Sequence, residues 1–172
     1  NEGVDKTHNP EFTMMECYQA YADYHDMMDL TEDLYQFAVK ETLGTTEVGL
    51  GDKKINFSKK WERITMYDAI KRYLGIDVQS LSDEEIKDQL KKYHLKYEGN
   101  PTLTGVGVGF VRGIAIATLF EAVEPHLIEP TFITDLPKET TALCKPKEDN
   151  PDLIERFEGY INGWEVANAY SE

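Results

Sequence analysis

The sequence contains few cysteines, a deficit of positive charge and no long uninterrupted hydrophobic run. Cys17 and Cys144 are the only cysteines in 172 residues and lie far apart, so their spacing indicates neither a disulfide framework nor a metal site. A reducing cytoplasm is the expected location. The formal net charge of −14 disfavours broad binding to a phosphate backbone, so any contact with nucleic acid is expected to be local.

The most apolar stretch, Val106 to Phe120, is interrupted by Arg112 and is shorter than the roughly 20 residues that cross a bilayer. We therefore expect no membrane segment, and a buried helix over about 110–127. The glycines in GVGVGFVRG follow no predicted strand and lack an acidic residue at the dinucleotide-binding spacing. They indicate a flexible lead into this helix and not a phosphate loop. No signal peptide is visible at the start of the sequence.

With 41% hydrophobic residues, the chain has enough apolar material for one domain. Alternation and β-former content predict a strand over residues 11–21, short strands within 46–64 and a short strand over 130–134. A loop is expected over 138–152. Capping residues and closing glycines predict three helices, which run from Thr31 to Gly44, from Thr65 to Gly75 and from Ser82 to about Tyr93.

A two-residue hairpin turn is predicted at Asn162-Gly163, between two aromatic and β-branched segments. Strands at both ends and helices between them indicate an α+β fold, an antiparallel sheet with flanking helices and a helical insertion at about 60–128. No internal repeat is visible.

Several polar side chains fall on the predicted strands. A structural role would explain Phe12 and Tyr18 as core residues and Glu16 as an edge charge. However, carboxylates repeated on apolar strands are costly to desolvate unless they meet a cation, so a metal ion or an ammonium group is the expected partner. The polar residues in question are Glu16 and Tyr18 near the start, and Glu158, Glu165, Asn168, Tyr170 and Glu172 near the end.

Two long motifs resemble those of the class II lysyl-tRNA synthetases. The first is Asn1-Glu2-Gly3 followed by residues 7–16, Tyr18 and residues 20–24, which resembles the second signature motif of that family. The second comprises residues 130–135, 157–158 and 165–172. The resemblance therefore covers essentially the whole chain.

The resemblance implies that residues 1–172 are a fragment of one catalytic domain. The motif 2 loop and strand would occupy 1–24, and the active-site strands about 130–137 and 155–172. A family arginine just before the position of Asn1, the anticodon-binding barrel, the dimer-interface motif and the third motif would lie outside the chain. We therefore expect the chain alone to be inactive and to self-associate through unpaired sheet edges, and the full-length protein to be a homodimer.

The implied reaction is ATP-dependent activation of lysine to lysyl-adenylate and its transfer to tRNA(Lys). Catalysis would come from positioning and charge stabilisation, with no acid, base or nucleophile supplied by a side chain. A buried carboxylate beside a phenol would select the lysine ammonium group. The resemblance assigns Glu2, His8, Asn9 and Phe12 to ATP, Glu16, Tyr18, Asn168, Tyr170 and Glu172 to lysine, and Glu158 and Glu165 to Mg²⁺.

Two departures and two alternatives accompany this assignment. Trp164 stands where the family usually has arginine, and residues 141–145 depart from the expected Ser-Pro-Leu pattern. One alternative is a relative that lysylates elongation factor P, but such relatives are shorter between the motifs, and residues 60–128 are long. The other is a non-catalytic binding module. The presence of Glu16, Asn168, Glu172 and both metal carboxylates argues against this alternative.

The predicted hairpin creates a conflict of strand faces. A two-residue turn makes Tyr160 face Glu165 and Glu158 face Ala167, so the two glutamates share a face. Strict alternation then sends Asn168 and the residues after it to the opposite face. We therefore predict a β-bulge near residues 166–168. The bulge would turn four residues of the hairpin toward the face that carries Phe12, Glu16 and Tyr18. These four are Glu158, Glu165, Asn168 and Glu172.

Overall fold

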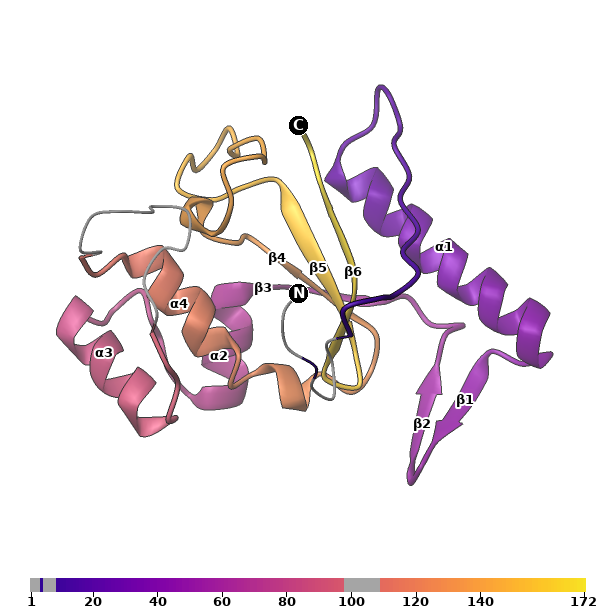
Figure 1. Ribbon diagram of the computed structural model, residues 1–172, viewed down its shortest axis with the longest axis horizontal. Helices are drawn as coiled ribbons and strands as arrows, with labels where there is room; N and C mark the ends of the chain where they lie inside the picture. The colour runs from indigo at the N-terminus through magenta and orange to yellow at the C-terminus, as the bar shows by residue number, and fades with distance from the viewer. Residues whose placement is uncertain (1–3, 5–8, 98–108) are drawn as a thin grey trace.

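The computed structural model describes residues 4, 9–97 and 109–172 (Figure 1). Its central four-stranded sheet has the order β3-β4-β5-β6, with β3 and β4 parallel and the other neighbours antiparallel. A separate antiparallel hairpin, β1-β2, projects from the body of the molecule. The strands are β1 (Glu47–Leu50), β2 (Lys53–Asn56), β3 (Glu62–Thr65), β4 (Thr131–Thr134), β5 (Arg156–Ile161) and β6 (Trp164–Tyr170).

Helices cover both faces of the sheet, and the mixture of helices and strands agrees with the predicted α+β class. Figure 1 shows α1 on one side and the group α2, α3 and α4 on the other. Among the described residues, no helix is both long and apolar enough to cross a membrane. The helices are α1 (Tyr24–Leu43), α2 (Met66–Leu74), α3 (Asp83–Lys92) and α4 (Arg112–Phe120), with short 3-10 helices η1 (Glu124–His126) and η2 (Lys138–Thr140).

Two apolar cores follow from the alternation of side chains along the central strands. On one face, Phe132 and Phe157 pack with Trp61 and with residues of α1. The Trp61 and Phe132 rings stack with their centroids 4.6 Å apart. On the other face, Ile133 and Tyr160 pack against α2 and α4. The sheet is therefore packed against helices on both sides.

Helix α1 begins earlier than predicted. Its N-cap is Asp23, whose Oδ1 accepts hydrogen bonds from the backbone N–H groups of His25 and Asp26 at 2.7 and 3.2 Å. Thr31, the predicted cap, lies inside the helix and donates its hydroxyl to the carbonyl of Met27. The predicted start is therefore wrong, whereas the predicted end at Gly44, with a φ of 70°, is confirmed.

The other predicted helices are confirmed with one change. Thr65 and Ser82 cap α2 and α3, and Gly75 closes α2. The helix predicted over 110–127 ends at Phe120, since the next residues form tighter turns that lead to Pro125 in η1. The glycine-rich lead at 105–108 lies outside the described residues.

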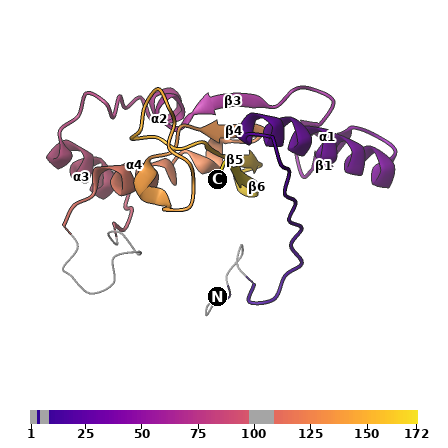
Figure 2. The same ribbon diagram turned by 90° about the horizontal axis from the view of Figure 1, so that it is seen from above.

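The strand predicted over 11–21 is wrong. The structure assigns no strand there, and the side chains of residues 11–21 are all exposed, with Tyr21 fully exposed at a turn. Figure 2 shows residues 9–20 running away from the sheet, so they have no neighbouring strand to pair with. Without a ladder, alternation does not fix a common face for Phe12, Glu16 and Tyr18.

Candidate metal and substrate site

The hairpin between β5 and β6 contains the predicted β-bulge. Asn162 and Gly163 have φ of 53° and 78°, as a two-residue type I′ turn requires. Tyr160 pairs with Glu165, but Gly159 pairs with Ala167, so Val166 is the extra residue. The Val166 carbonyl instead accepts a 2.9 Å hydrogen bond from the Tyr35 hydroxyl of α1. The predicted irregularity is confirmed.

The bulge changes the register beyond it. Regular pairing would place Glu158 opposite Ala167, but in the structure Glu158 pairs with Asn168. Asn168 therefore shares a face with Glu158, while Ala167 and Ala169 pack toward α1. The bulge thus brings Asn168, which was predicted to bind the lysine substrate, to the same face as Glu158 and Glu165, which were predicted to bind the metal.

This face of the hairpin lines a hollow beside the end of α4, which we call the acidic hollow. The turn is held there because Asn162 and Gly163 donate backbone hydrogen bonds to the carbonyls of Ile128 and Leu127, at 3.0 and 2.8 Å. The segment that contains Glu124 is thereby placed next to the strands. The polar residues that line the hollow include Glu121, Glu124, Arg156, Glu158, Tyr160 and Glu165.

A continuous set of hydrogen bonds joins the strand residues of this hollow. The Tyr160 hydroxyl lies 2.9 Å from Oε2 of Glu158, whose Oε1 accepts a 2.8 Å bond from Nη2 of Arg156. Nε of Arg156 donates to Oδ1 of Asn168 at 3.2 Å, and Nδ2 of Asn168 donates to Oε1 of Glu165 at 3.1 Å. Glu158 and Glu165, which were predicted to bind the metal, therefore belong to one network with Asn168, which was predicted to bind the lysine substrate.

The surroundings of Glu124 and Glu158 in the acidic hollow raise the pKa of both carboxyl groups. Burial, followed by the charge of Glu121, raises the pKa of Glu124 to about 7, and a 3.4 Å contact with the Tyr160 hydroxyl opposes this rise. Burial also raises the pKa of Glu158, against the lowering effect of Arg156. Ionised carboxylates crowded in this way gain most from a bound cation.

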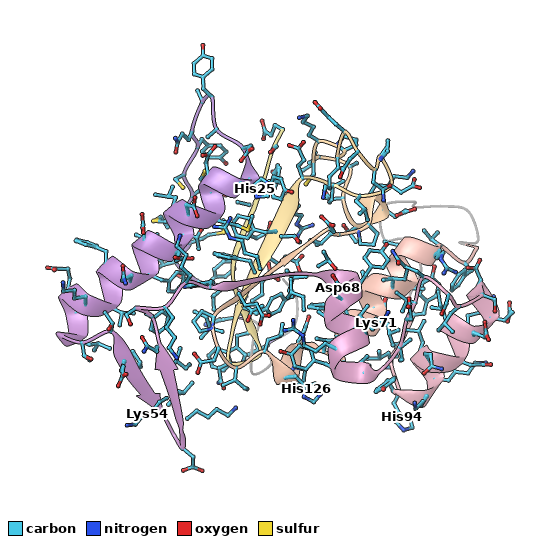
Figure 3. All side chains as sticks on the ribbon, turned by 180° about the vertical axis from the view of Figure 1, so that it is seen from behind. His25, Lys54, Asp68, Lys71, His94 and His126 are labelled. Carbon is cyan, nitrogen blue, oxygen red and sulfur yellow. The ribbon has the colours of Figure 1, made fainter. Side chains whose placement is uncertain are left out.

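The donor set fits Mg²⁺. Glu158 and Glu165 offer oxygen atoms only. Of the described histidines, His94 lines the same hollow, whereas His25 lies in α1 and His126 in η1 (Figure 3). Within the described part of the chain, no group of three or more His, Cys, Asp or Glu is arranged to hold a metal. A pair of carboxylates is sufficient for Mg²⁺, which is commonly bound by one or two carboxylates together with substrate phosphates.

A second hollow lies at the end of β6. Its lining includes Tyr18, Tyr170 and Glu172, three of the five residues assigned to lysine, with Met27 of α1. Glu16 lines neither this hollow nor the acidic hollow. Glu172 is exposed, and Tyr18 is 82% exposed, so the expected buried carboxylate is not present in the structure.

The residues assigned to ATP are not brought together. Glu2 and His8 lie outside the described residues. Asn9 and Phe12 belong to the exposed segment before α1, where Oδ1 of Asn9 accepts a 3.4 Å bond from the backbone N–H of Glu11. Phe12 is 63% exposed and lines neither of the two hollows.

Three residues of the network were missed from the sequence. Arg156 and Tyr160 lie two residues on either side of Glu158, so strand alternation alone places them on its face. That signal could have been used. Glu124 carried no such signal, because its position depends on how the end of α4 packs against the hairpin turn.

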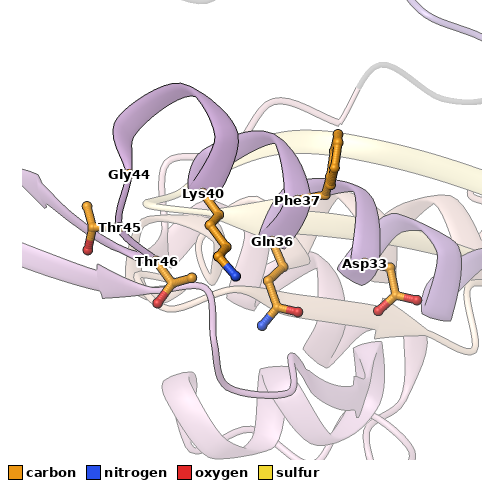
Figure 4. A pocket seen from close by; sticks show the side chains of 7 residues that line it. All are labelled: Asp33, Gln36, Phe37, Lys40, Gly44, Thr45 and Thr46. Carbon is orange, nitrogen blue, oxygen red and sulfur yellow. The ribbon is translucent and has the colours of Figure 1, made fainter.

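A third hollow, at the C-terminal end of α1, has no convergent chemistry. Figure 4 shows that Asp33, Gln36 and Lys40 point to one side of the helix and Phe37 to the other. Phe37 is 64% exposed. The remaining lining comes from Gly44, Thr45 and Thr46. This hollow is best described as surface relief beside a helix end.

Comparison with known proteins finds several lysine–tRNA ligases that are similar to this chain. Residues 1–172 match the family described as tRNA synthetases class II (D, K and N). A lysine–tRNA ligase of Saccharolobus solfataricus is 51% identical over all of this chain and 33% of its own length. The corresponding identities are 45% for a lysine–tRNA ligase of Thermoanaerobacter pseudethanolicus and 45% for lysine–tRNA ligase 2 of Methanosarcina mazei, over all of this chain and 33% and 32% of their lengths. The chain thus spans about a third of the length of these curated relatives.

Proposed function

Since the chain belongs to the class II tRNA synthetases (D, K and N), we propose that it is part of an enzyme that activates lysine with ATP and transfers it to tRNA(Lys). The curated relatives named above are lysine–tRNA ligases, which favours lysine over aspartate and asparagine, the other two amino acids in the description of the family. The observation that carries the proposal is the bulge at Val166. It gathers Glu158, Glu165 and Asn168 into one hydrogen-bonded set on one face.

Glu158 and Glu165 are the residues proposed to hold Mg²⁺. When bound, the ion neutralises charge on the phosphates of ATP. Arg156 and Tyr160 each occupy one oxygen of Glu158, and a carboxylate offers about four lone-pair sites, so both oxygens retain capacity for a further partner. Glu165 has an Asn168 contact on Oε1. The two side chains are thus oriented before any ligand arrives.

Lysine recognition is assigned to residues around β6. Glu172 is proposed to pair with the ε-ammonium group, beside the phenols of Tyr18 and Tyr170 in the same hollow. Asn168 and Glu16 are proposed to bind the polar groups of the amino-acid end. A shorter or neutral substrate would leave these groups without a partner, which is the physical basis for its rejection.

The first step needs positioning more than side-chain chemistry. The lysine carboxylate attacks the α-phosphorus of ATP, the bond to pyrophosphate breaks, and lysyl-adenylate forms. Holding the two reactants in line lowers the barrier without a protein nucleophile. On the family resemblance alone, Phe12 is assigned to stacking on adenine, and Glu2, His8 and Asn9 to ATP.

The remaining parts of the proposal concern the whole protein. Since the chain covers about a third of its curated relatives, we propose that activity requires the rest of that length. We also propose a cytoplasmic homodimer. In the residues that the structure describes, β6 forms one edge of the sheet and has no neighbour on its outer side, which suits pairing with a further strand.

The test is pyrophosphate exchange by the full-length protein. Exchange that depends on lysine, together with charging of tRNA(Lys), is the expected result, and the 172-residue chain alone should give none. Charging of elongation factor P without charging of tRNA(Lys) would contradict the proposal. So would exchange driven equally well by aspartate, asparagine and lysine.

A further inference from the structure

Arg156 makes two hydrogen bonds to partners with different proposed roles. Its Nη2 lies 2.8 Å from Glu158, which is assigned to the metal, and its Nε lies 3.2 Å from Asn168, which is assigned to lysine. The side chains of Arg156 and Glu158 are only 15% and 14% exposed. This pair is therefore largely removed from water, unlike most ion pairs among the described residues.

The amide of Asn168 has its orientation set from both ends. Its oxygen accepts from Arg156, and its nitrogen donates to Glu165. A guanidinium group can only donate, and a carboxylate can only accept while ionised. Turning the amide by 180° would place its NH₂ group against a donor and its oxygen against an acceptor. Arg156 and Glu165 therefore select the same orientation.

We propose that Arg156 is a positioning residue that fixes the Asn168 amide and the Glu158 carboxylate relative to each other, and so links the lysine site to the metal site. The proposal rests on the function proposed above, because it uses the roles of Glu158 and Asn168. Arg156 itself contacts neither substrate nor metal in this scheme. Its effect is transmitted through the side chains that it holds.

Arginine suits this task better than lysine. The guanidinium group is planar and carries donors in a fixed fork, so two acceptors at a set separation are held at once. An ammonium group is a single point on a flexible stem and follows one partner at a time. Arg156→Lys therefore keeps the positive charge beside Glu158 while releasing Asn168.

The kinetic test uses the full-length protein and lysine-dependent pyrophosphate exchange. Arg156→Lys should raise KM for lysine about tenfold, while KM for ATP changes less than about twofold. Arg156→Gln is the second variant if Arg156→Lys does not fold; because it also removes the charge beside Glu158, it should raise both KM for lysine and the magnesium concentration needed for half-maximal activity. Arg72→Lys is the matched control, since Arg72 forms an exposed 2.6 Å ion pair with Glu62, and should leave both constants unchanged.

A merely structural role would lower activity without separating the two substrates. Equal changes in both KM values, or an unchanged KM for lysine, would overturn the proposal. A second measurement does not depend on the reaction. In a double-mutant cycle of Arg156→Lys and Asn168→Ala, the shifts in thermal unfolding midpoint should be clearly non-additive, because the two residues share a contact.

The cycle separates failure of the inference from failure of the proposed function. If the wild-type protein shows no lysine-dependent exchange, the proposed function fails, and non-additive shifts still support the positioning contact. If exchange depends on lysine but the shifts are additive, the function stands and Arg156 does not position Asn168.

Discussion

Tyr160 holds the carboxylate of Glu158, two residues before it on the same strand, with a 2.9 Å contact between its hydroxyl and Oε2. The same hydroxyl lies 3.4 Å from Oε1 of Glu124. One hydroxyl proton cannot serve two ionised carboxylates. The shorter contact is thus the main hydrogen bond that Tyr160 donates, and its donation to Glu124 is the weaker of the two.

Replacing Tyr160 by phenylalanine removes the donor to Glu158 without removing the ring. The largely buried carboxylate then lacks one partner, which should lower the free energy of unfolding by about 1–2 kcal/mol. It should also increase the magnesium concentration needed for half-maximal activity, because Glu158 is less well held. Urea unfolding and a magnesium titration of the full-length protein measure the two effects.

Tyr21→Phe is the control for this change. Tyr21 is fully exposed, so losing its hydroxyl should leave the midpoint of unfolding and the magnesium requirement unchanged. Wild-type behaviour of Tyr160→Phe in both measurements would mean that the hydroxyl does not support Glu158.

The raised pKa of Glu124 predicts a pH dependence of stability. Because the folded-state pKa of about 7 exceeds the ordinary 4.5, the folded state binds more protons than the unfolded state between these values. The contribution of Glu124 is fully present below about pH 4.5 and is lost as the pH rises through about 7. With allowance for solvent screening of this half-exposed group, the loss is on the order of 1 kcal/mol.

Glu124→Gln should remove this dependence, since glutamine does not titrate. The variant should gain stability relative to wild type between pH 5 and pH 8, as measured by unfolding midpoints across that range. Glu148→Gln is the control, because Glu148 has an 89% exposed side chain and should change nothing. Parallel pH profiles of Glu124→Gln and wild type would contradict the assignment.

Local signals in the sequence were sufficient for most of the fold. The caps Thr65 and Ser82 and the turn at Asn162-Gly163 each act through neighbours within a few residues, so the sequence alone reveals them. The bulge at Val166 was predictable because one site had to reconcile two strand faces. Non-local features were not predictable in this way. The segment over 11–21 has strand-like alternation but no neighbouring strand in the described structure, and Glu124 reaches the site only through tertiary packing.

Glu172→Gln should raise KM for lysine in the full-length protein far more than KM for ATP. Glutamine keeps the size of the side chain but loses the charge that pairs with the ε-ammonium group. Because Glu172 is exposed in the structure, the expected effect is about tenfold, equivalent to about 1.4 kcal/mol, and not the larger penalty of a buried pair. Equal effects on both substrates would remove Glu172 from the lysine site. Glu41→Gln, at an exposed position of α1, is the control.

Deleting Val166 tests whether the site needs the bulge itself or only the strand faces that the bulge sets. Without the extra residue, Tyr160–Glu165, Gly159–Ala167 and Glu158–Asn168 become consecutive pairs of a regular ladder, so Asn168 stays on the face of Glu158 and Glu165. The bonds of Asn168 to Arg156 and Glu165 would therefore be kept, whereas Tyr35 would lose the carbonyl that it binds at the bulge.

The deletion should therefore keep lysine-dependent pyrophosphate exchange in the full-length protein, with a nearly unchanged KM for lysine, and lower the free energy of unfolding by about 1 kcal/mol because the Tyr35 hydrogen bond is lost. Val166→Ala is the matched control. It trims a half-buried side chain but keeps the carbonyl that Tyr35 binds, so it should change neither that bond nor the KM for lysine. A folded deletion variant without lysine-dependent exchange would show that the site needs the extra residue itself and not only the shared face of Glu158, Glu165 and Asn168.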